Sequence, residues 1–346
     1  MWGRTRGLGV GLAVVIAAAA ATGAAANDSS AELATGGLVL TKNPAIEMRS
    51  EDLFISTKAV RVHYVFANTS AADVTILVAF PMPDITTLGG DDNIVVPTES
   101  PTNLLGFVTT VDGQPVTAQV EQKALKTGVD ETAYLKGLGV PLAPHLQSTN
   151  DVLDKLPKAT QDALVARGLA VANDYDAGHG MEHHLVATWT LKTTFYWRQT
   201  FPAGRTISVE HNYQPSVGGS AQTSWGDPTF AASPQYTAGR QLYCVDDAFL
   251  AAIAKAAAAA KAALKPPHVE WYLSEQRIDY VLTTGANWKA PIGDFHMTID
   301  KGDAANLVSF CGTGVAKISP TQFEVHYTNF TPTKDVAILL LVPETP

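Results

Sequence analysis

The region from Asn173 to His184 holds the densest group of side chains that can do chemistry, with three histidines and three acidic residues in twelve positions. Imidazole and carboxylate groups are the ligands that Zn²⁺, Ni²⁺ and Cu²⁺ take from proteins. Glycines at positions 178 and 180 allow the backbone to fold back, so that side chains on either side can converge. The pattern predicts either a divalent-metal site, with no other cofactor, or an ordinary solvated loop. The candidate ligands are His179, Glu182, His183 and His184.

A second candidate for binding is Trp225, in the short polar loop 224–228. An indole in a loop can stack on a sugar ring or contact a partner protein, so carbohydrate or peptidoglycan binding is an alternative to metal binding. The sequence contains no G-x-S-x-G, H-E-x-x-H, Walker A or G-x-G-x-x-G motif. Sites assembled from distant residues leave no such motif, so enzymatic activity stays open, and the absence favours a non-catalytic role.

The N-terminus has the pattern of a secretory signal peptide. Arg4 and Arg6 precede the apolar stretch 8–21, and Ala24 and Ala26 stand at the small positions that a signal peptidase requires. We therefore expect residues 1–26 to be removed, which leaves 22 basic against 33 acidic residues. An acidic surface of this size repels phosphate backbones and argues against a nucleic-acid partner. After residue 26, no apolar run reaches the length of a membrane span.

The chain contains two cysteines, Cys244 and Cys311. An even pair in an exported protein is more typical of a disulfide than of a catalytic thiol. Neither has a second cysteine at the close spacing that zinc sites use. We expect the two to form a disulfide.

Period-two hydrophobicity dominates the chain and predicts a mainly β fold with antiparallel, sandwich-like sheets. Residues 60–66 and 74–80 are expected to pair as a hairpin, and a second hairpin is expected to turn at 112–113. Helical spacing predicts a helical insertion at about 124–172 and an alanine-rich helix at about 247–264. Proline, glycine and serine at 215–239 are typical of a linker or a long loop. Three histidines on the predicted strands are interpreted as structural: His63, His211 and His326.

The chain also contains a short sequence pattern that occurs twice, the Val-His-Tyr repeat. Val62-His63-Tyr64 and Val325-His326-Tyr327 are each followed by a polar turn and a more apolar strand. The match is either a chance similarity between hairpins or a sign that both ends share one plan. For the domains we expect a β domain with the helical insertion at 27–239 and a β region at 240–346, which is either separate or integrated with the first.

The resemblance of this chain to a known family is carried by residues 27–29, 31–38, 48–56, 80–84, 189–197, 199–204 and 210–219. Together these blocks resemble an exported bacterial family known as domain of unknown function 4424. The resemblance implies export in a bacterium and a single unit, which weakens a division near residue 239. It implies no catalytic residues, because the family has no settled activity.

Together these features predict a periplasmic or secreted protein of unknown molecular function that binds an envelope protein or ligand without catalysing a reaction. The alternatives are a metal-binding protein or metal-dependent hydrolase that uses the loop at 173–184, and a carbohydrate-binding module that uses Trp225.

Overall fold

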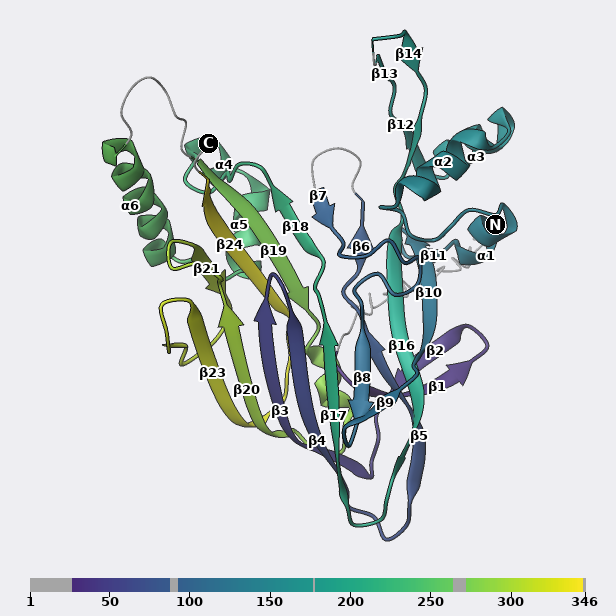
Figure 1. Ribbon diagram of the computed structural model, residues 1–346, viewed down its shortest axis with the longest axis vertical. Coiled ribbons are helices and arrows are strands. Elements are labelled where there is room, and N and C mark those ends of the chain that lie inside the picture. Colours follow the sequence, from purple (N-terminus) through teal and green to yellow (C-terminus); the bar gives the residue numbers. More distant parts are fainter. Residues whose placement is uncertain (1–26, 88–92, 177, 264–271, 345–346) are drawn as a thin grey trace, which may run out of the picture.

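The computed structural model describes residues 27–87, 93–176, 178–263 and 272–344. Three large sheets build most of the molecule (Figure 1), which confirms the predicted mainly β, sandwich-like architecture. Neighbouring strands in the largest sheet are antiparallel, except that β3 and β20 run parallel. Its order is β22 (Ala316–Lys317), β23 (Gln322–Phe330), β20 (Ile292–Asp300), β3 (Ile46–Ser56), β4 (Val60–Asn68), β17 (Thr206–Tyr213), β8 (Val108–Val111) and β9 (Gln114–Val116).

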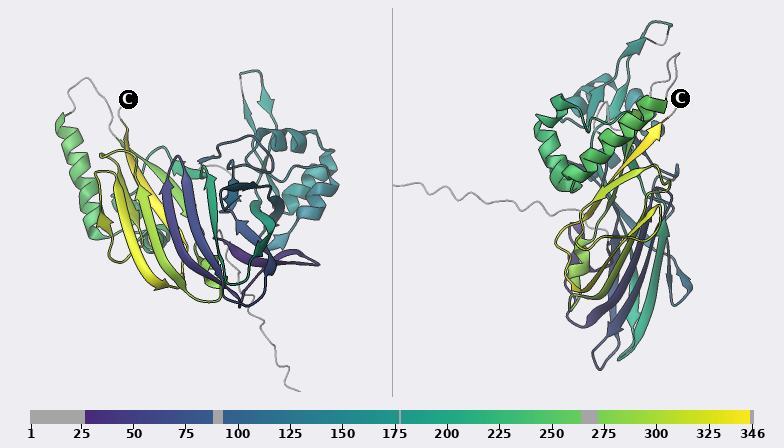
Figure 2. Two further views of the ribbon diagram at one scale, coloured as in Figure 1. Left: turned by 60° about the horizontal axis from the view of Figure 1, so that its bottom comes forward. Right: turned by 90° about the vertical axis from the view of Figure 1, so that its left-hand side faces the viewer.

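The other two large sheets lie behind this eight-stranded sheet (Figure 2). The seven-stranded sheet has the order β11 (Val129–Asp130), β10 (Gln119–Lys126), β16 (Thr190–Phe201), β5 (Val74–Pro81), β1 (Ser29–Ala34) and β2 (Gly37–Thr41), with β6 (Ile85–Thr86) paired to β16. The five-stranded sheet has the order β21 (Leu307–Phe310), β24 (Val336–Glu344), β19 (Tyr272–Tyr280), β18 (Val217–Ser220) and β7 (Asn93–Val95). Two short hairpin-like pairs complete the strands: β12 (Ala170–Ala172) with β15 (Leu185–Ala187), and β13 (Tyr175–Asp176) with β14 (Met181–Glu182).

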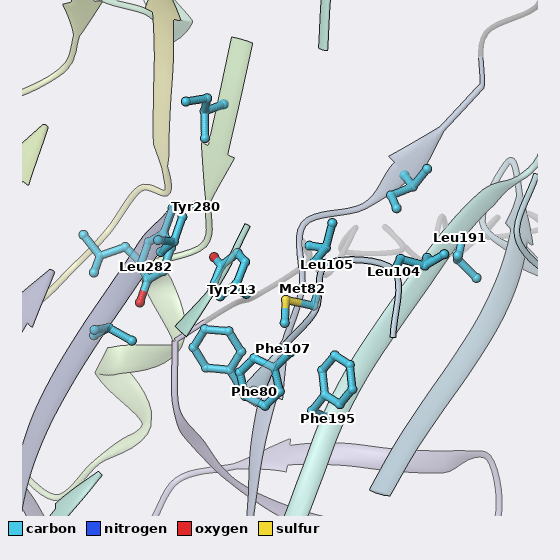
Figure 3. Close-up of a cluster of buried hydrophobic side chains, with 14 of the residues drawn as sticks. Phe80, Met82, Leu104, Leu105, Phe107, Leu191, Phe195, Tyr213, Tyr280 and Leu282 are labelled. Carbon is cyan, nitrogen blue, oxygen red and sulfur yellow. The ribbon is translucent and has the colours of Figure 1, made fainter. Parts of the chain in front are cut away.

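One continuous core joins the three sheets. Aromatic rings from different layers meet at its centre (Figure 3). Phe107 stacks on Phe80 and on Phe195, with ring centroids 5.2 and 4.5 Å apart. Because buried aromatic side chains contribute large apolar areas, this stack is a main attachment between the eight- and seven-stranded sheets.

The prediction that segments 60–66 and 74–80 pair as a hairpin is wrong. β4 pairs with β3 and β17 in the eight-stranded sheet, whereas β5 pairs with β1 and β16 in the seven-stranded sheet. Each strand has an apolar face, and the chain buries both by crossing from one layer to the other. Asn68 stabilises the connection between the two layers, because its side-chain amide donates hydrogen bonds of 2.8 Å to the carbonyls of Ala72 and Phe201. The second predicted turn is confirmed, since β8 and β9 pair across Asp112–Gly113.

The Val-His-Tyr repeat corresponds to a connection between two sheets that occurs twice in the fold. β23 lies in the eight-stranded sheet and the following β24 lies in the five-stranded sheet, as β4 and β5 lie in facing sheets. His63 and His326 therefore occupy equivalent positions on the same exposed face. Strands from both sides of residue 239 also pair directly, β20 with β3 and β19 with β18.

The helical insertion is confirmed and contains three helices, α1 (Thr132–Gly137), α2 (Gln147–Lys155) and α3 (Lys158–Ala166). Figure 1 shows α2 and α3 beside β12, below the β13–β14 pair and at one end of the seven-stranded sheet. Leu153 and Leu164 point into the main core and are fully buried. The alanine-rich helix is also confirmed as α6 (Asp247–Ala263), and position 264 of the prediction lies outside the described residues.

The predicted linker at 215–239 is wrong, because it contains β18 and two helices, α4 (Pro228–Ala231) and α5 (Pro234–Leu242). Asp227 and Ser233 cap these helices by accepting backbone hydrogen bonds, and each helix begins with a proline. Proline and polar residues here start helices rather than form a loop. A short 3₁₀ helix, η1 (Thr283–Asn287), follows β19.

Cys244 and Cys311 form a disulfide, as predicted. The bond joins the end of the α5 segment to the chain that follows β21. Among the described helices, none is long and apolar enough to cross a membrane.

Candidate functional site

A row of polar side chains crosses the outer face of the eight-stranded sheet in register. His326 of β23 pairs with His296 of β20, and His296 pairs with Asp52 of β3. Asp52 pairs with His63 of β4, which pairs with Glu210 of β17. Since neighbouring strands lie about 4.8 Å apart, the row spans roughly 19 Å.

Strand periodicity and one irregularity set the direction of these side chains. His63 alternates with the buried Val62 and Tyr64, so it points to solvent. In β3, the register shifts between Met48 and Ser50. A bulge at this point inverts the alternation that follows, so Glu51 enters the core and its neighbour Asp52 faces solvent.

Two adjoining hollows lie along the row. The first has a volume of about 480 Å³ and the second about 380 Å³, and Asp52 and His63 line both. The first is also lined by Phe54, Arg61, Val108, Thr110, Glu210 and Asn212. The second is also lined by Ser50, Asp294, His296, Glu324 and His326.

The charges of the second hollow are paired with one another. His296 Nδ1 lies 3.1 Å from Asp52 Oδ1, and His296 Nε2 lies 3.1 Å from Glu324 Oε2. His326 Nε2 pairs with Asp294. Partial burial alone would lower the pKa of His296, but the hydrogen bonds to Glu324 and Asp52 outweigh it and raise this pKa. The carboxylates of Asp52, Asp294 and Glu324 in the second hollow are therefore each in contact with an imidazole.

The first hollow presents opposite charges that are not paired. Arg61 places its guanidinium over the ring of Phe54, 4.3 Å from the centroid. Within the described part of the chain, neither Arg61 nor Glu210 forms an ion pair. Arg61 is opposite Asn212 and Glu210 is opposite His63, so the two residues are diagonal neighbours across β4 and β17, with Cα atoms roughly 7 Å apart. A ligand with one positive and one negative group could satisfy both.

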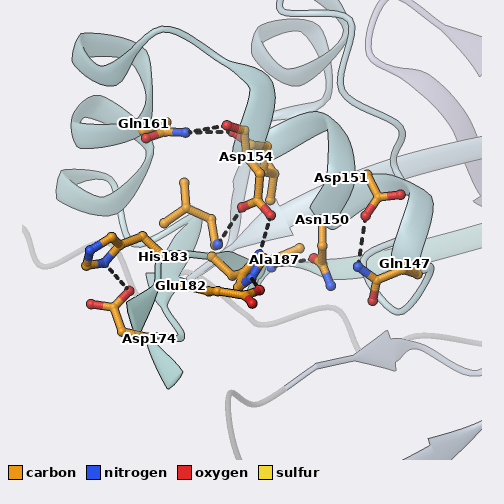
Figure 4. A network of polar contacts seen from close by, with 12 residues as sticks. Gln147, Asn150, Asp151, Asp154, Gln161, Asp174, Glu182, His183 and Ala187 are labelled. Atoms are coloured by element: carbon orange, nitrogen blue, oxygen red, sulfur yellow. Dashed lines mark hydrogen bonds and ion pairs between the residues drawn. The ribbon is translucent and has the colours of Figure 1, made fainter. Parts of the chain in front are cut away.

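The predicted metal ligands lie in or next to the β13–β14 hairpin. Figure 4 shows Glu182 and His183 among them. His184 lies between two carboxylates, with Nδ1 2.7 Å from Asp154 Oδ2 and Nε2 3.2 Å from Glu182 Oε2. These hydrogen bonds raise the pKa of His184. His183 contacts Asp174 instead, at 3.1 Å, and 76% of its side chain is exposed.

His179 is exposed in the turn between the two short strands. Of the four predicted ligands, His184 and Glu182 therefore contact each other, whereas His183 contacts Asp174. In the described residues, no group of three or more such side chains has the geometry to hold a metal ion. Metal binding at this loop stays a prediction.

Trp225 lies in a second apolar cluster with residues of α6 and the five-stranded sheet. Its side chain is 6% exposed and contacts Phe230 and Tyr236, with ring centroids 5.4 and 5.3 Å away. A sugar could stack on this indole only after these rings move. Ligand binding by Trp225 also stays a prediction.

Sequence reasoning did not identify the row on the outer face. The Val-His-Tyr repeat contains His63 and His326. It could not show that β20 brings His296 between them, because the parallel pairing of β3 and β20 joins residues that are 244 positions apart. The free pair Arg61 and Glu210 gave no local signal either.

A family model described as Domain of unknown function (DUF4424) matches residues 26–339. Among solved structures, the chain is similar to a proposed nutrient-binding protein of Legionella pneumophila, at 17% identity over 92% of this chain and 70% of that one, with a TM-score of 0.43. It is also similar to an M1 zinc metallopeptidase of Deinococcus radiodurans, at 9% identity over 87% of this chain and 43% of that one, with a TM-score of 0.19. No curated protein matches the sequence.

Proposed function

The chain belongs to the DUF4424 family, and we propose that it is an exported binding protein of the bacterial cell envelope whose ligand is a short, zwitterionic peptide. The binding site in this proposal is the first hollow on the outer face of the eight-stranded sheet. Arg61 would bind the carboxylate of the ligand, and Glu210 would bind its ammonium group.

Two features support export. Residues 1–26, which lie outside the described residues, have the pattern of a cleavable leader. The Cys244–Cys311 disulfide fits an oxidising compartment such as the periplasm.

The size of the hollow supports a small ligand. A volume of about 480 Å³ lies in the range of small-molecule sites. An extended chain rises about 3.4 Å per residue, so the two ends of a di- or tripeptide lie roughly 7–10 Å apart. The Cα atoms of Arg61 and Glu210 are roughly 7 Å apart, and the Arg61 guanidinium lies over Phe54 on the side of β4 away from β17, so a ligand of at least this length is needed to reach both charges. Thr110 and Asn212 line the same hollow and can bond a peptide group, and Phe54 offers an apolar surface.

The observation that carries the proposal is the pair of free, opposite charges on the two sides of one hollow. Charged hydrogen bonds are stronger than neutral ones, and a zwitterion can form one at each end. The carboxylates of the second hollow are already occupied by imidazoles, which leaves the first hollow as the place where charge is available.

Calorimetric titration with dialanine, N-acetyl-dialanine and dialanine amide tests this proposal. We expect dialanine to bind about 5- to 10-fold more tightly than either blocked form, because each exposed charge pair contributes roughly 1 kcal/mol. Arg61→Gln should abolish the discrimination against the amide, and Glu210→Gln should abolish the discrimination against the N-acetyl form.

Matched controls are Arg198→Gln on β16 and Glu32→Gln on β1, which change exposed charges outside the hollow. Neither should alter the affinity for dialanine. Equal binding of all three peptides, or loss of discrimination in a control variant, would contradict the proposal.

A further inference from the structure

The segment that begins at Asn27, directly after the predicted leader, is built into the core. Asn27 and Asp28 are both fully buried. The backbone nitrogen of Asn27 donates a 2.8 Å hydrogen bond to Thr284 Oγ1, and the Thr284 hydroxyl donates one of 2.7 Å to the Asn27 carbonyl. The indole of Trp288 donates a 2.8 Å hydrogen bond to the Asp28 carbonyl. The nitrogen of the peptide bond that we predict to be cleaved therefore lies inside the fold.

Two buried carboxyl groups share this part of the core. Asp28 Oδ1 lies 3.0 Å from His211 Nε2. Glu51 Oε2 accepts a 2.8 Å hydrogen bond from Asn27 Nδ2, and the Tyr280 hydroxyl donates a longer one, of 3.4 Å, to Glu51 Oε1. Within the described residues, no lysine or arginine contacts either carboxyl group. The cluster holds two acids and one imidazole, and the imidazole of His211 pairs with Asp28, so Glu51 has no cationic partner among the described residues.

Several polar atoms of the cluster also lack a partner. The free acceptors nearest in sequence to the cleavage bond are Asn27 Oδ1 and Asp28 Oδ2. Leaving such buried atoms unpaired costs free energy, and burying an ionised carboxylate without a cation costs more. The cluster is therefore incomplete as long as the Asn27 nitrogen is a neutral amide with one hydrogen to donate.

We propose that removal of the leader completes this cluster: cleavage of the Ala26–Asn27 bond converts the Asn27 nitrogen into an α-ammonium group that acts as a buried counter-ion for Asp28 and Glu51. This inference rests on the export proposed above. In the cleavage, water adds across the amide bond. Its hydroxyl goes to the Ala26 carbonyl carbon, and its hydrogen goes to the Asn27 nitrogen. That nitrogen also takes up the proton that the new carboxyl group loses.

The new group matches the donors that the cluster lacks. An ammonium carries three N–H donors, of which one remains on Thr284 Oγ1 and two are available to Asn27 Oδ1 and Asp28 Oδ2. A positive charge at this position also stabilises the ionised form of Glu51, whose described neighbours include Asn27, the acidic Asp28 and the hydroxyls of Tyr64 and Tyr280. The native fold should therefore be more stable in the processed chain than in a chain with any residue before Asn27.

The test compares two forms of the otherwise complete mature chain. One form is exported by its own leader and purified from the envelope, and the other carries one alanine before Asn27. Intact mass first shows whether the exported chain begins at Asn27. A different start would overturn the inference without bearing on peptide binding, which is titrated separately.

Thermal unfolding and amine labelling then give two independent readouts. We expect the alanine-extended chain to melt about 5 °C lower, which is the size of shift that loss of a buried ionic contact gives in a domain of this size. Under native conditions, the α-amine of Asn27 should resist an amine-reactive label, whereas the α-amine of the added alanine should react readily. Equal melting temperatures together with equal labelling would overturn the proposal.

Glu51→Gln in both forms supplies a further criterion. It should lower the melting temperature of the chain that begins at Asn27 and raise that of the extended chain. The control is Asp84→Asn, whose carboxylate bonds Lys192 at 2.7 Å in another sheet and should shift both forms equally. A shift of the same sign for Glu51→Gln in both forms would contradict the assignment of the ammonium as its counter-ion.

Discussion

Glu51→Gln in the chain that keeps an amide at Asn27 should make the protein more stable at neutral pH. Burial raises the pKa of Glu51 from 4.5 to about 8, against the hydrogen bond from Asn27, and the neighbouring Asp28 carboxylate adds to the rise. The folded protein therefore holds a proton that the unfolded chain releases above pH 4.5. For a raised folded-state pKa, the stability is highest at low pH and is lost as the pH rises toward 8.

The magnitude follows from the separation of the two pKa values. Each unit of pKa difference corresponds to about 1.36 kcal/mol in the free energy of unfolding. Relative to low pH, the raised pKa of Glu51 therefore lowers the free energy of unfolding by about 1 kcal/mol at pH 5, about 3 kcal/mol at pH 7 and up to roughly 5 kcal/mol above pH 8. Glutamine has nearly the same shape and can still accept the hydrogen bond from Asn27 Nδ2, but it has no proton to lose. The variant should therefore lack this part of the pH dependence.

Urea unfolding at pH 5, 7 and 8 measures this effect through the midpoint and the slope m. We expect the advantage of the variant to grow from about 1 to about 3 kcal/mol between pH 5 and pH 7, at constant m. The Glu32→Gln variant is the control, because that carboxyl group lies exposed on β1, away from the buried cluster. The reasoning is refuted if Glu51→Gln is destabilising at pH 7 and leaves the pH dependence of the parent chain unchanged.

Two further predictions concern the core and the hairpin at 173–184. Phe107→Ala should cost about 3–5 kcal/mol in urea unfolding, because Phe107 is 5% exposed and its loss breaks the stack between two sheets; a cost below 1 kcal/mol would contradict this packing. Elemental analysis of untagged mature protein should find near-stoichiometric zinc, nickel or copper if the hairpin binds metal, and replacing His179, His183 and His184 with alanine should remove it. A protein that is folded but metal-free would leave that hairpin as a solvated loop.

The parts of the fold that depend on local pattern could be predicted from the sequence. The alanine-rich run indicated α6, and the paired cysteines indicated the disulfide. Sheet membership could not be predicted in the same way. β4 and β5 have the alternation of a hairpin, yet the chain crosses between layers after Asn68. Period-two hydrophobicity identifies an apolar face but does not say whether the next strand pairs at the edge or packs on that face.

The candidate site was hidden for a related reason. His296 joins Asp52 only because β20 pairs in parallel with β3, and no local feature of either segment indicates this pairing. A weaker signal was present in β3, where the buried Met48 and Leu53 are separated by an odd number of positions. Strict alternation cannot place both inside, so the sequence requires a bulge between them. That reasoning could have indicated that Glu51 points inward and Asp52 outward.

A crystal structure of the mature protein soaked with a short peptide such as dialanine tests the proposed binding function most directly. We predict that the peptide lies in the first hollow, with its carboxylate on the guanidinium of Arg61 and its ammonium on the carboxylate of Glu210. The same soak of the Arg61→Gln, Glu210→Gln double variant should leave the hollow without peptide. A peptide bound elsewhere, or bound equally in the double variant, would contradict the assignment of this face as the binding site.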